Sequence, residues 1–179
     1  MSNLVSVVIH SFNRFDYLTN AINSVLNQSM NDLEIILIND ESTDERYYKE
    51  LFGDKVKQID IRRNQYPRWT GSRQALINIG IENARGKYIA LLDDDDCWME
   101  DKLEKQLTKM EQDYFKFSST EGYFGLGTFD PEKKYPLYNK EHFYKVLRRK
   151  YRYTKYLKNG KTISLYCQKI KTFIVNLVD

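Results

Sequence analysis

The chain has 179 residues, a length that suits one domain with room for a small appendage. Its apolar fraction of 41% supports a real core and argues against global disorder. The formal net charge of +3 hides an asymmetry. Residues 1–130 carry 15 Lys and Arg against 22 Asp and Glu, whereas residues 131–179 carry 13 against 3. The basic C-terminal part therefore suggests an anionic partner.

Cysteine usage and hydropathy bear on the compartment. Cys97 and Cys167 are distant in a chain without a recognisable secretory signal, so we expect free thiols in a reducing compartment. The apolar run 4–9 is too short for a signal-peptide core, and no run approaches the ~20 apolar residues of a membrane span. We therefore expect a cytoplasmic, soluble protein, or at most one that contacts a membrane peripherally.

Apolar runs and helical spacings alternate along the first 112 residues. The expected strands cover residues 4–9, 33–38, 56–61 and 87–92. Helical spacing and start signals predict helices at about 18–26, 45–52, 71–84 and 98–110. Gly86 is expected to end the third helix, and Glu100 and Asp101 to lie in the first turn of the fourth. This alternation predicts an α/β fold, a doubly wound and mostly parallel sheet with helices on both faces.

The pattern weakens after residue 112, where a short basic C-terminal extension follows. A helix is expected at 141–150, while 162–168 and 172–178 are interpreted as strands or a terminal helix. The predicted organisation is a core at 1–112 and a short C-terminal region of the same domain at 113–179.

Four consecutive aspartates, Asp93 to Asp96, follow the apolar run 88–92. They should emerge at the carboxyl end of a central strand, where open α/β sheets bind their ligands. Four adjacent carboxylates cost stability unless a cation or hydrogen-bond donors compensate. In an extended backbone Asp93 and Asp95 would point one way, and Asp94 and Asp96 the other. Such oxygen ligands suit Mg²⁺ or Mn²⁺, the alternative being a solvated acidic turn before the next helix.

The loops at 10–14, 39–44 and 93–97 each follow a predicted strand. Right-handed crossovers place these strand ends on one edge of the sheet, so the loops are expected to converge. Glycine-rich phosphate-binding and dinucleotide-binding signatures do not follow the first strand, which disfavours ATPases and dehydrogenases.

Four segments together resemble family 2 glycosyltransferases. They are the strand and loop at 5–14, the segment 24–29, the loop at 38–44 and the stretch 78–98 that contains the aspartates. Their order and spacing make the resemblance specific, and it covers about residues 4–110. It implies a GT-A fold, which is Rossmann-like, with residues 1–112 as a nucleotide-sugar-binding core and 113–179 on the acceptor side.

The resemblance also implies roles for single side chains. The loop after the first strand would contact the base and ribose of the donor through His10, Ser11 and Phe12. Asp40 would accept a hydrogen bond from a pyrimidine N–H, which favours a uridine or thymidine diphosphate donor. The family usually has proline at the position of His10 and often tyrosine at that of Phe12. Phe12 can stack on a base but cannot donate a hydrogen bond.

By the same resemblance, Asp93 and Asp95 form the Asp-x-Asp motif that binds the metal and the diphosphate, Asp95 being the best metal candidate. Asp94 would lie nearer the ribose, and Asp96 would only begin the next helix. A divalent cation, Mn²⁺ or Mg²⁺, would stabilise the charge that develops on the diphosphate leaving group. Carboxylates without a cation would oppose that charge.

Further basic and acidic side chains complete the predicted site. Arg73 is assigned to the donor phosphates, and Arg62, Arg63 and Arg68 are alternatives, each of which can also be a solvated surface residue. An inverting transfer needs a general base to deprotonate the acceptor hydroxyl. Glu141, at the start of a predicted helix, fits that role best by position.

The predicted function is thus an inverting, metal-dependent transfer of a sugar from a nucleotide-diphosphate donor to a hydroxyl of a glycan, a lipid-linked or a protein acceptor. One alternative is a donor-binding module without full transferase activity. Another is a nucleotidyltransferase, which ranks last because the loop 10–14 has no glycine.

The basic and aromatic stretch 145–171 allows three interpretations. It can face an anionic or lipid-linked acceptor at a membrane surface, or it can be a solvated face. It can also bind nucleic acid, but no motif supports this, and no nucleic acid is expected.

Overall fold

The computed structural model describes residues 4–50, 52–62, 73–120, 156–158, 161–163 and 173–176, with several positions between 122 and 135. The chain divides into two compact units. Residues 1–120, 127–129 and 172–179 form the first, and residues 121–126 and 130–171 form the second.

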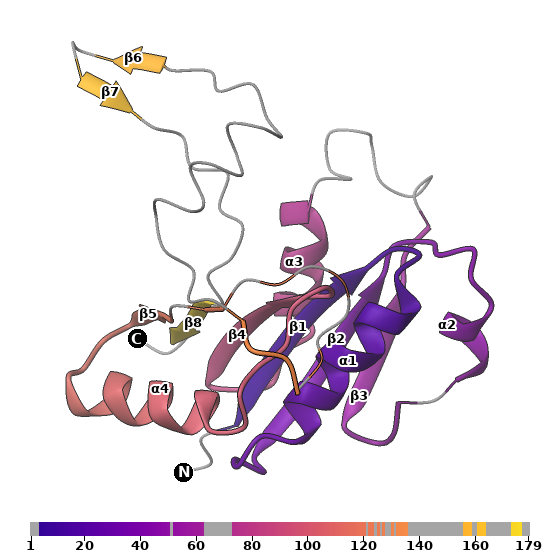
Figure 1. Ribbon diagram of the computed structural model, residues 1–179, viewed down its shortest axis with the longest axis horizontal. Coiled ribbons are helices and arrows are strands. Elements are labelled where there is room, and N and C mark those ends of the chain that lie inside the picture. Colours follow the sequence, from indigo (N-terminus) through magenta and orange to yellow (C-terminus); the bar gives the residue numbers. More distant parts are fainter. Residues whose placement is uncertain are drawn as a thin grey trace. The chain divides into compact units, whose positions relative to one another are not determined.

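A six-stranded sheet in the order β3-β2-β1-β4-β8-β5 organises the first unit (Figure 1). Its strands are β1 (Val5–Ser11), β2 (Leu33–Asn39), β3 (Val56–Asp60), β4 (Tyr88–Asp93), β5 (Phe117–Ser119) and β8 (Phe173–Asn176). The first four strands are parallel, and β8 is antiparallel to both β4 and β5. The prediction of a doubly wound, mostly parallel sheet is therefore confirmed. The expected element at 172–178 is a strand.

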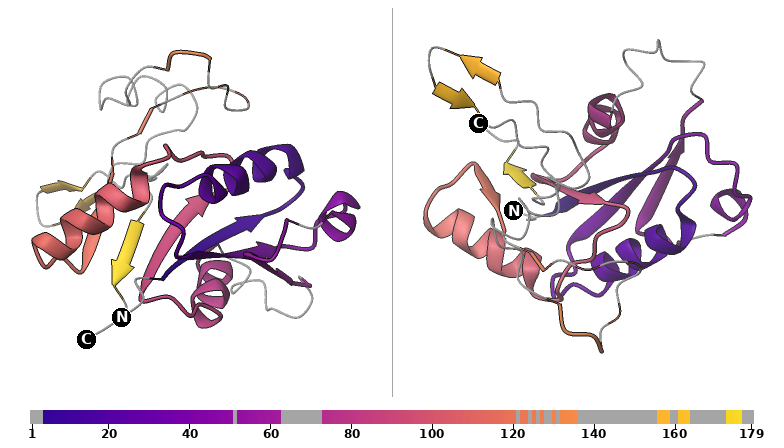
Figure 2. Two further views of the ribbon diagram at one scale, coloured as in Figure 1. Left: turned by 90° about the horizontal axis from the view of Figure 1, so that it is seen from below. Right: turned by 45° about the horizontal axis from the view of Figure 1, so that its top comes forward.

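Helices cover both faces of this sheet, as Figure 2 shows. They are α1 (Phe15–Leu26), α2 (Arg46–Lys49), α3 (Arg73–Glu82) and α4 (Lys102–Gln112). The larger core cluster joins α1 and α4 to one face through residues such as Val7, Ile35 and Leu103. A smaller cluster on the opposite face joins Ile36 and Ile38 to Leu76 of α3. Because side chains alternate along a strand, the strand residues of the two clusters lie on opposite faces of the sheet.

The helix α3 packs closely against β1. A Cβ built at Gly80 of α3 would lie 2.3 Å from Cγ1 of Val8. Gly86 lies similarly close to β1, since a Cβ there would lie 2.7 Å from the backbone nitrogen of Ser6. The helix α3 ends at Glu82, so Gly86 does not end it as predicted. Its lack of a side chain instead lets the α3–β4 connection approach β1.

The loop after the aspartates is longer than predicted, because α4 begins only at Lys102. The expected first-turn residues Glu100 and Asp101 therefore precede the helix. The loop is held against the end of α1 by two hydrogen bonds. The Trp98 N–H donates to Ser24 Oγ at 3.0 Å, and the Ser29 N–H donates to the Glu100 backbone oxygen at 2.8 Å. These contacts stabilise the loop in place of a first helical turn.

In the second unit, β6 (Tyr156–Lys158) and β7 (Lys161–Ile163) form an antiparallel pair, so the start of the predicted element 162–168 is a strand. The predicted helix 141–150 lies outside the described residues. Within the part of the chain that the structure describes, no helix combines the length and the hydropathy needed to cross a membrane.

Candidate functional site

The carboxyl ends of β1, β2 and β4 meet at one edge of the sheet. In the strand register Ser11 lies beside Asn39 of β2, and His10 lies beside Asp93 of β4. The Asp40 N–H donates to the Ser11 backbone oxygen at 3.0 Å. The predicted convergence of these strand ends is confirmed.

Side chains tie the first two loops together beyond the strands. Asn13 has a left-handed backbone with φ of 52°, a conformation that asparagine tolerates better than most residues. Its side-chain oxygen accepts the N–H of Thr43 at 2.7 Å, and its own N–H donates to Ser42 Oγ at 3.0 Å. These bonds position the start of α1 relative to the end of β2.

Asp94 is held from the α1 side of the sheet by a buried chain of hydroxyl groups. Ser11 Oγ donates to its carboxylate at 2.7 Å, and Ser11 Oγ in turn shares a hydrogen bond with the hydroxyl of Tyr47. Because Ser11 has one proton and donates it to Asp94, Tyr47 is the donor in that second bond. The Tyr47 hydroxyl then accepts the Arg14 backbone N–H at 2.9 Å. Asp94 is only 6% exposed, and this burial raises its pKa, against the lowering effects of Ser11 and Arg14.

Two arginines form ion pairs with three of the four aspartates. The guanidinium of Arg14 lies 3.2 Å from oxygens of both Asp94 and Asp95. From the opposite face, Arg73 of α3 forms an ion pair with Asp93. Two guanidinium groups therefore compensate part of the charge that the sequence predicted to need compensation.

The aspartates turn back on themselves. The Asp96 N–H donates to the Asp93 oxygen at 3.1 Å, which closes a turn across Asp94 and Asp95. Carboxylate oxygens of Asp93, Asp95 and Asp96 consequently lie within 4.8 Å of one another. Asp96 thus shares a side with Asp93 and Asp95, contrary to the extended alternation that we predicted. Three such oxygens fit a Mg²⁺ or Mn²⁺ ion, and this fit makes Asp96 a further candidate ligand.

His10 lies on the α3 side of the same edge. Burial lowers its pKa, with a smaller lowering effect from the charge of Arg73, so the imidazole is neutral at physiological pH. Asp93, Asp94 and Asp40 act on it in the opposite direction, which places His10 within electrostatic reach of all three carboxylates. Phe12, at 39% exposure, presents a ring that is accessible for stacking. The described donor-site residues of the prediction therefore come from the same edge of the sheet.

Sequence reasoning missed two members of this arrangement, Tyr47 and Arg14. Arg14 lies in the loop at 10–14, and its positive charge beside the predicted diphosphate site was a usable signal. Tyr47 carried no such signal, since its partner Ser11 is 36 positions away. Among the predicted residues, Glu141, Arg63 and Arg68 lie outside the described part of the chain.

Comparison with known proteins assigns the family. The family described as Glycosyl transferase family 2 matches residues 6–175, which is nearly the whole chain. The chain belongs to this family.

Individual relatives agree with that assignment. An uncharacterized glycosyltransferase of Rickettsia bellii is 39% identical over 133 residues, which are 73% of this chain and 18% of the relative. WfgD of Escherichia coli, a UDP-Glc:alpha-D-GlcNAc-diphosphoundecaprenol beta-1,3-glucosyltransferase, is 32% identical over 115 residues, 64% of this chain and 44% of WfgD. The chain thus spans less than half the length of these relatives.

A solved structure confirms the fold. The crystal structure of residues 1–349 of S. aureus TarS superposes with a TM-score of 0.52 at 21% identity, covering 63% of this chain and 34% of the other. The predicted GT-A architecture is therefore correct.

Proposed function

We propose that this chain is the donor-binding part of a metal-dependent glycosyltransferase that moves a sugar from a nucleotide-diphosphate donor to a hydroxyl acceptor with inversion. The observation that carries the proposal is the convergence of His10, Asp40 and the aspartates at one sheet edge. The neutral imidazole of His10 can donate a hydrogen bond to a nucleobase or accept one from it, and the carboxylate of Asp40 can accept one. A divalent cation could bind to carboxylate oxygens of Asp93, Asp95 and Asp96, and it would then lie beside the diphosphate.

The donor is proposed to be a uridine diphosphate sugar, with thymidine diphosphate as the near alternative. A carboxylate such as Asp40 accepts the N–H of either pyrimidine. The relative WfgD, 32% identical over the shared region, is named for its UDP-Glc donor, which supports the uridine form. Its named acceptor is linked to diphosphoundecaprenol, so a lipid-linked acceptor is the first to test among glycan, lipid and protein hydroxyls.

The acceptor side is proposed to involve residues 113–179, with Glu141 as general base. In an inverting displacement the base removes the proton of the acceptor hydroxyl as the sugar–phosphate bond breaks. Mn²⁺ or Mg²⁺ would supply Lewis acidity toward the leaving diphosphate. The chain itself would orient the nucleobase and ribose of the donor at residues 10–12 and the donor phosphates near Arg73.

Calorimetry of UDP binding with and without Mn²⁺ tests the proposal. We expect UDP to bind measurably with Mn²⁺ and much more weakly with EDTA. A competing panel of UDP, dTDP, GDP and CDP sugars should rank the two pyrimidine-2,4-dione nucleotides first. The absence of UDP binding at millimolar Mn²⁺ would refute the donor assignment. UDP binding without turnover on any acceptor would favour the alternative of a donor-binding module.

A further inference from the structure

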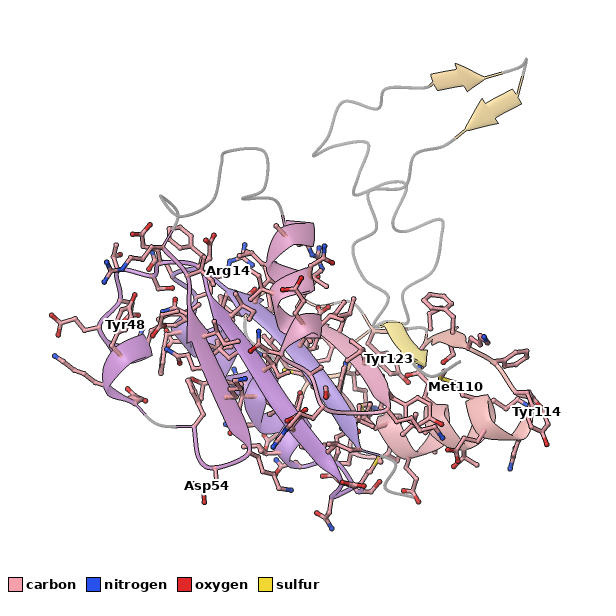
Figure 3. All side chains as sticks on the ribbon, turned by 180° about the vertical axis from the view of Figure 1, so that it is seen from behind. Arg14, Tyr48, Asp54, Met110, Tyr114 and Tyr123 are labelled. Atoms are coloured by element: carbon pink, nitrogen blue, oxygen red, sulfur yellow. The ribbon has the colours of Figure 1, made fainter. Side chains whose placement is uncertain are left out.

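Arg14 lies at the same sheet edge as the proposed donor site but has no role in it so far (Figure 3). It is the last residue before α1, and its side chain makes no capping bond to the helix. Its guanidinium instead bridges Asp94 and Asp95 at 3.2 Å each. The side chain of Arg14 thus interacts with the two carboxylates through its charge and not with the helix end.

The two ends of Arg14 are held very differently. Its backbone N–H is fixed by the buried hydroxyl of Tyr47 at 2.9 Å. Its side chain is 52% exposed, whereas the side chain of Asp94 is 9% exposed. The guanidinium can therefore leave the carboxylates by rotation of side-chain bonds alone, with the loop unchanged.

If the guanidinium of Arg14 left, the carboxylate of Asp94 would still have a hydrogen-bond donor. Ser11 Oγ donates to the second oxygen of Asp94 at 2.7 Å, and that bond belongs to the buried chain that continues to Tyr47. Asp94 thus has a permanent donor and an exchangeable one. Asp95, whose side chain is 30% exposed, has no such buried hydroxyl among the hydrogen bonds of the described residues.

Asp95 belongs to two arrangements at once. It pairs with Arg14, and it is also one of the three carboxylates whose oxygens lie within 4.8 Å of one another. A divalent cation on Asp95 would repel a guanidinium on the same carboxylate, because like charges a few ångströms apart disfavour each other. An incoming diphosphate, in contrast, attracts that guanidinium, since phosphate oxygens accept charge-assisted bonds from arginine.

We propose that Arg14 is an exchangeable counter-ion, which pairs with Asp94 and Asp95 in the free protein and moves to the donor diphosphate when a cation binds at Asp95. This inference rests on the proposed function. It assigns Arg14 as a further phosphate-binding residue. Arg14 would then weaken the binding of the cation and strengthen the binding of the nucleotide. A residue that only maintained the fold would support both ligands.

The test is to measure two affinities in Arg14→Ala by calorimetry on the 179-residue chain. With Mn²⁺ alone, we expect the variant to bind the ion about threefold or more tightly, because a competing positive charge is gone. With UDP at saturating Mn²⁺, we expect binding about tenfold or more weakly, because a charge-assisted contact to phosphate is lost. Arg14→Lys keeps the charge but not the planar fork, so its Mn²⁺ affinity should match the wild type and its UDP affinity should be intermediate.

Arg46→Ala is the matched control, since Arg46 also bridges two aspartates, Asp16 and Asp44, outside the aspartate cluster. It should change neither affinity. If Arg14→Ala binds both Mn²⁺ and UDP more weakly, or binds both as the wild type does, the inference is overturned. The proposed function still stands in that case, provided that the wild type binds UDP. A wild type that binds Mn²⁺ but no UDP refutes the proposed function, and the inference with it.

Discussion

The hydroxyl of Ser11 donates a 2.7 Å hydrogen bond to the carboxylate of Asp94, although 83 positions of sequence separate the two residues. The bond joins the ends of β1 and β4, and both residues are buried. It therefore fixes Asp94, one of the four consecutive aspartates, relative to the loop that would contact a nucleoside.

Replacing Ser11 by alanine should expose the cost of that buried carboxylate. We expect Ser11→Ala to lower the free energy of unfolding by about 1–3 kcal/mol, since a buried acceptor loses a donor. UDP affinity in Mn²⁺ should fall as well, because Asp94 is no longer fixed. Urea denaturation and calorimetry check the two effects, and Ser11→Thr, which restores a hydroxyl, should recover part of both. A Ser11→Ala protein with wild-type stability would show that the bond contributes nothing.

Tyr47 should matter through its hydroxyl rather than its ring. Tyr47→Phe keeps the edge-on contact with Phe15, at 5.3 Å between ring centroids, but removes the donor to Ser11 and the acceptor of the Arg14 N–H. We expect a loss of about 1–2 kcal/mol in the free energy of unfolding and a weaker UDP affinity, measured by urea denaturation and calorimetry.

The neighbouring Tyr48→Phe is the control for Tyr47→Phe. Tyr48 is 54% exposed, and its hydroxyl bonds only the backbone oxygen of Ser42 among the described contacts. Equal effects of the two variants on UDP binding would contradict a special role for Tyr47.

The fold was predictable because its decisive signals are local. The residues of β1 and β2 are buried on both faces, so each strand is mostly apolar, with Ser6 and Glu34 as interior exceptions that pair with each other, and can be recognised without its partners. The position of the aspartates at the sheet edge followed from that pattern, because a strand that ends in charge must end where ligands or solvent can meet it.

The contacts within the site were not predictable in the same way. Asp96 was assigned by assuming an extended backbone, but the hydrogen bond from its N–H to Asp93 closes a turn and reverses its side. Tyr47 and Arg14 reach Asp94 and its neighbours through long-range contacts, and no local pattern encodes those. Sequence alone therefore predicted that the carboxylates gather at the end of the strand, but neither the side on which Asp96 lies nor the donors that hold them.

Lys102 should make stability depend on pH. Its Nζ is buried without a hydrogen-bond partner among the described residues and lies 3.9 Å from the centroid of the Trp98 ring. Burial lowers its pKa from 10.5 to about 7, while the indole face attracts the ammonium and works against that lowering. Between these two pH values the unfolded chain binds a proton that the folded chain lacks, so the stability from this group increases as pH rises.

Lys102→Met should therefore be more stable than the wild type at pH 7, by up to a few kcal/mol, since each tenfold loss of proton affinity on folding costs about 1.4 kcal/mol. The advantage should shrink as the pH approaches that of an ordinary lysine pKa, about 10. Urea denaturation of both proteins at neutral, intermediate and alkaline pH measures the difference. Lys105→Met, at an exposed position of the same helix, should show no such trend. A constant difference between Lys102→Met and wild type across this pH range would exclude a neutral Lys102.

Gly80 should tolerate no side chain while Val8 faces it. A Cβ at Gly80 would lie 2.3 Å from Cγ1 of Val8, a distance that forces one element to move. We expect Gly80→Ala to cost about 1–3 kcal/mol of unfolding free energy, as overpacked cores do. In the double variant with Val8→Ala the clash is removed, so the combined loss, measured by urea denaturation, should be smaller than the sum of the two single losses. Additive losses would show that α3 can move away from β1 freely.

Asp95 and Asp96 should differ in how strongly they support nucleotide binding through a cation. Asp95→Ala removes a carboxylate that the sequence and the structure both place in the cluster, so we expect a loss of Mn²⁺-dependent UDP binding of about tenfold or more. Asp96→Ala removes the carboxylate that only the turn brings there. It should produce a smaller but measurable loss if Asp96 contributes an oxygen ligand.

Asp101→Ala, in the same loop but outside the cluster, is the matched control. Calorimetric titration of UDP at several Mn²⁺ concentrations separates the effects, because a lost cation ligand raises the Mn²⁺ needed for half-maximal UDP binding. An Asp96→Ala curve that overlays the wild type would return Asp96 to the role of a solvated turn residue.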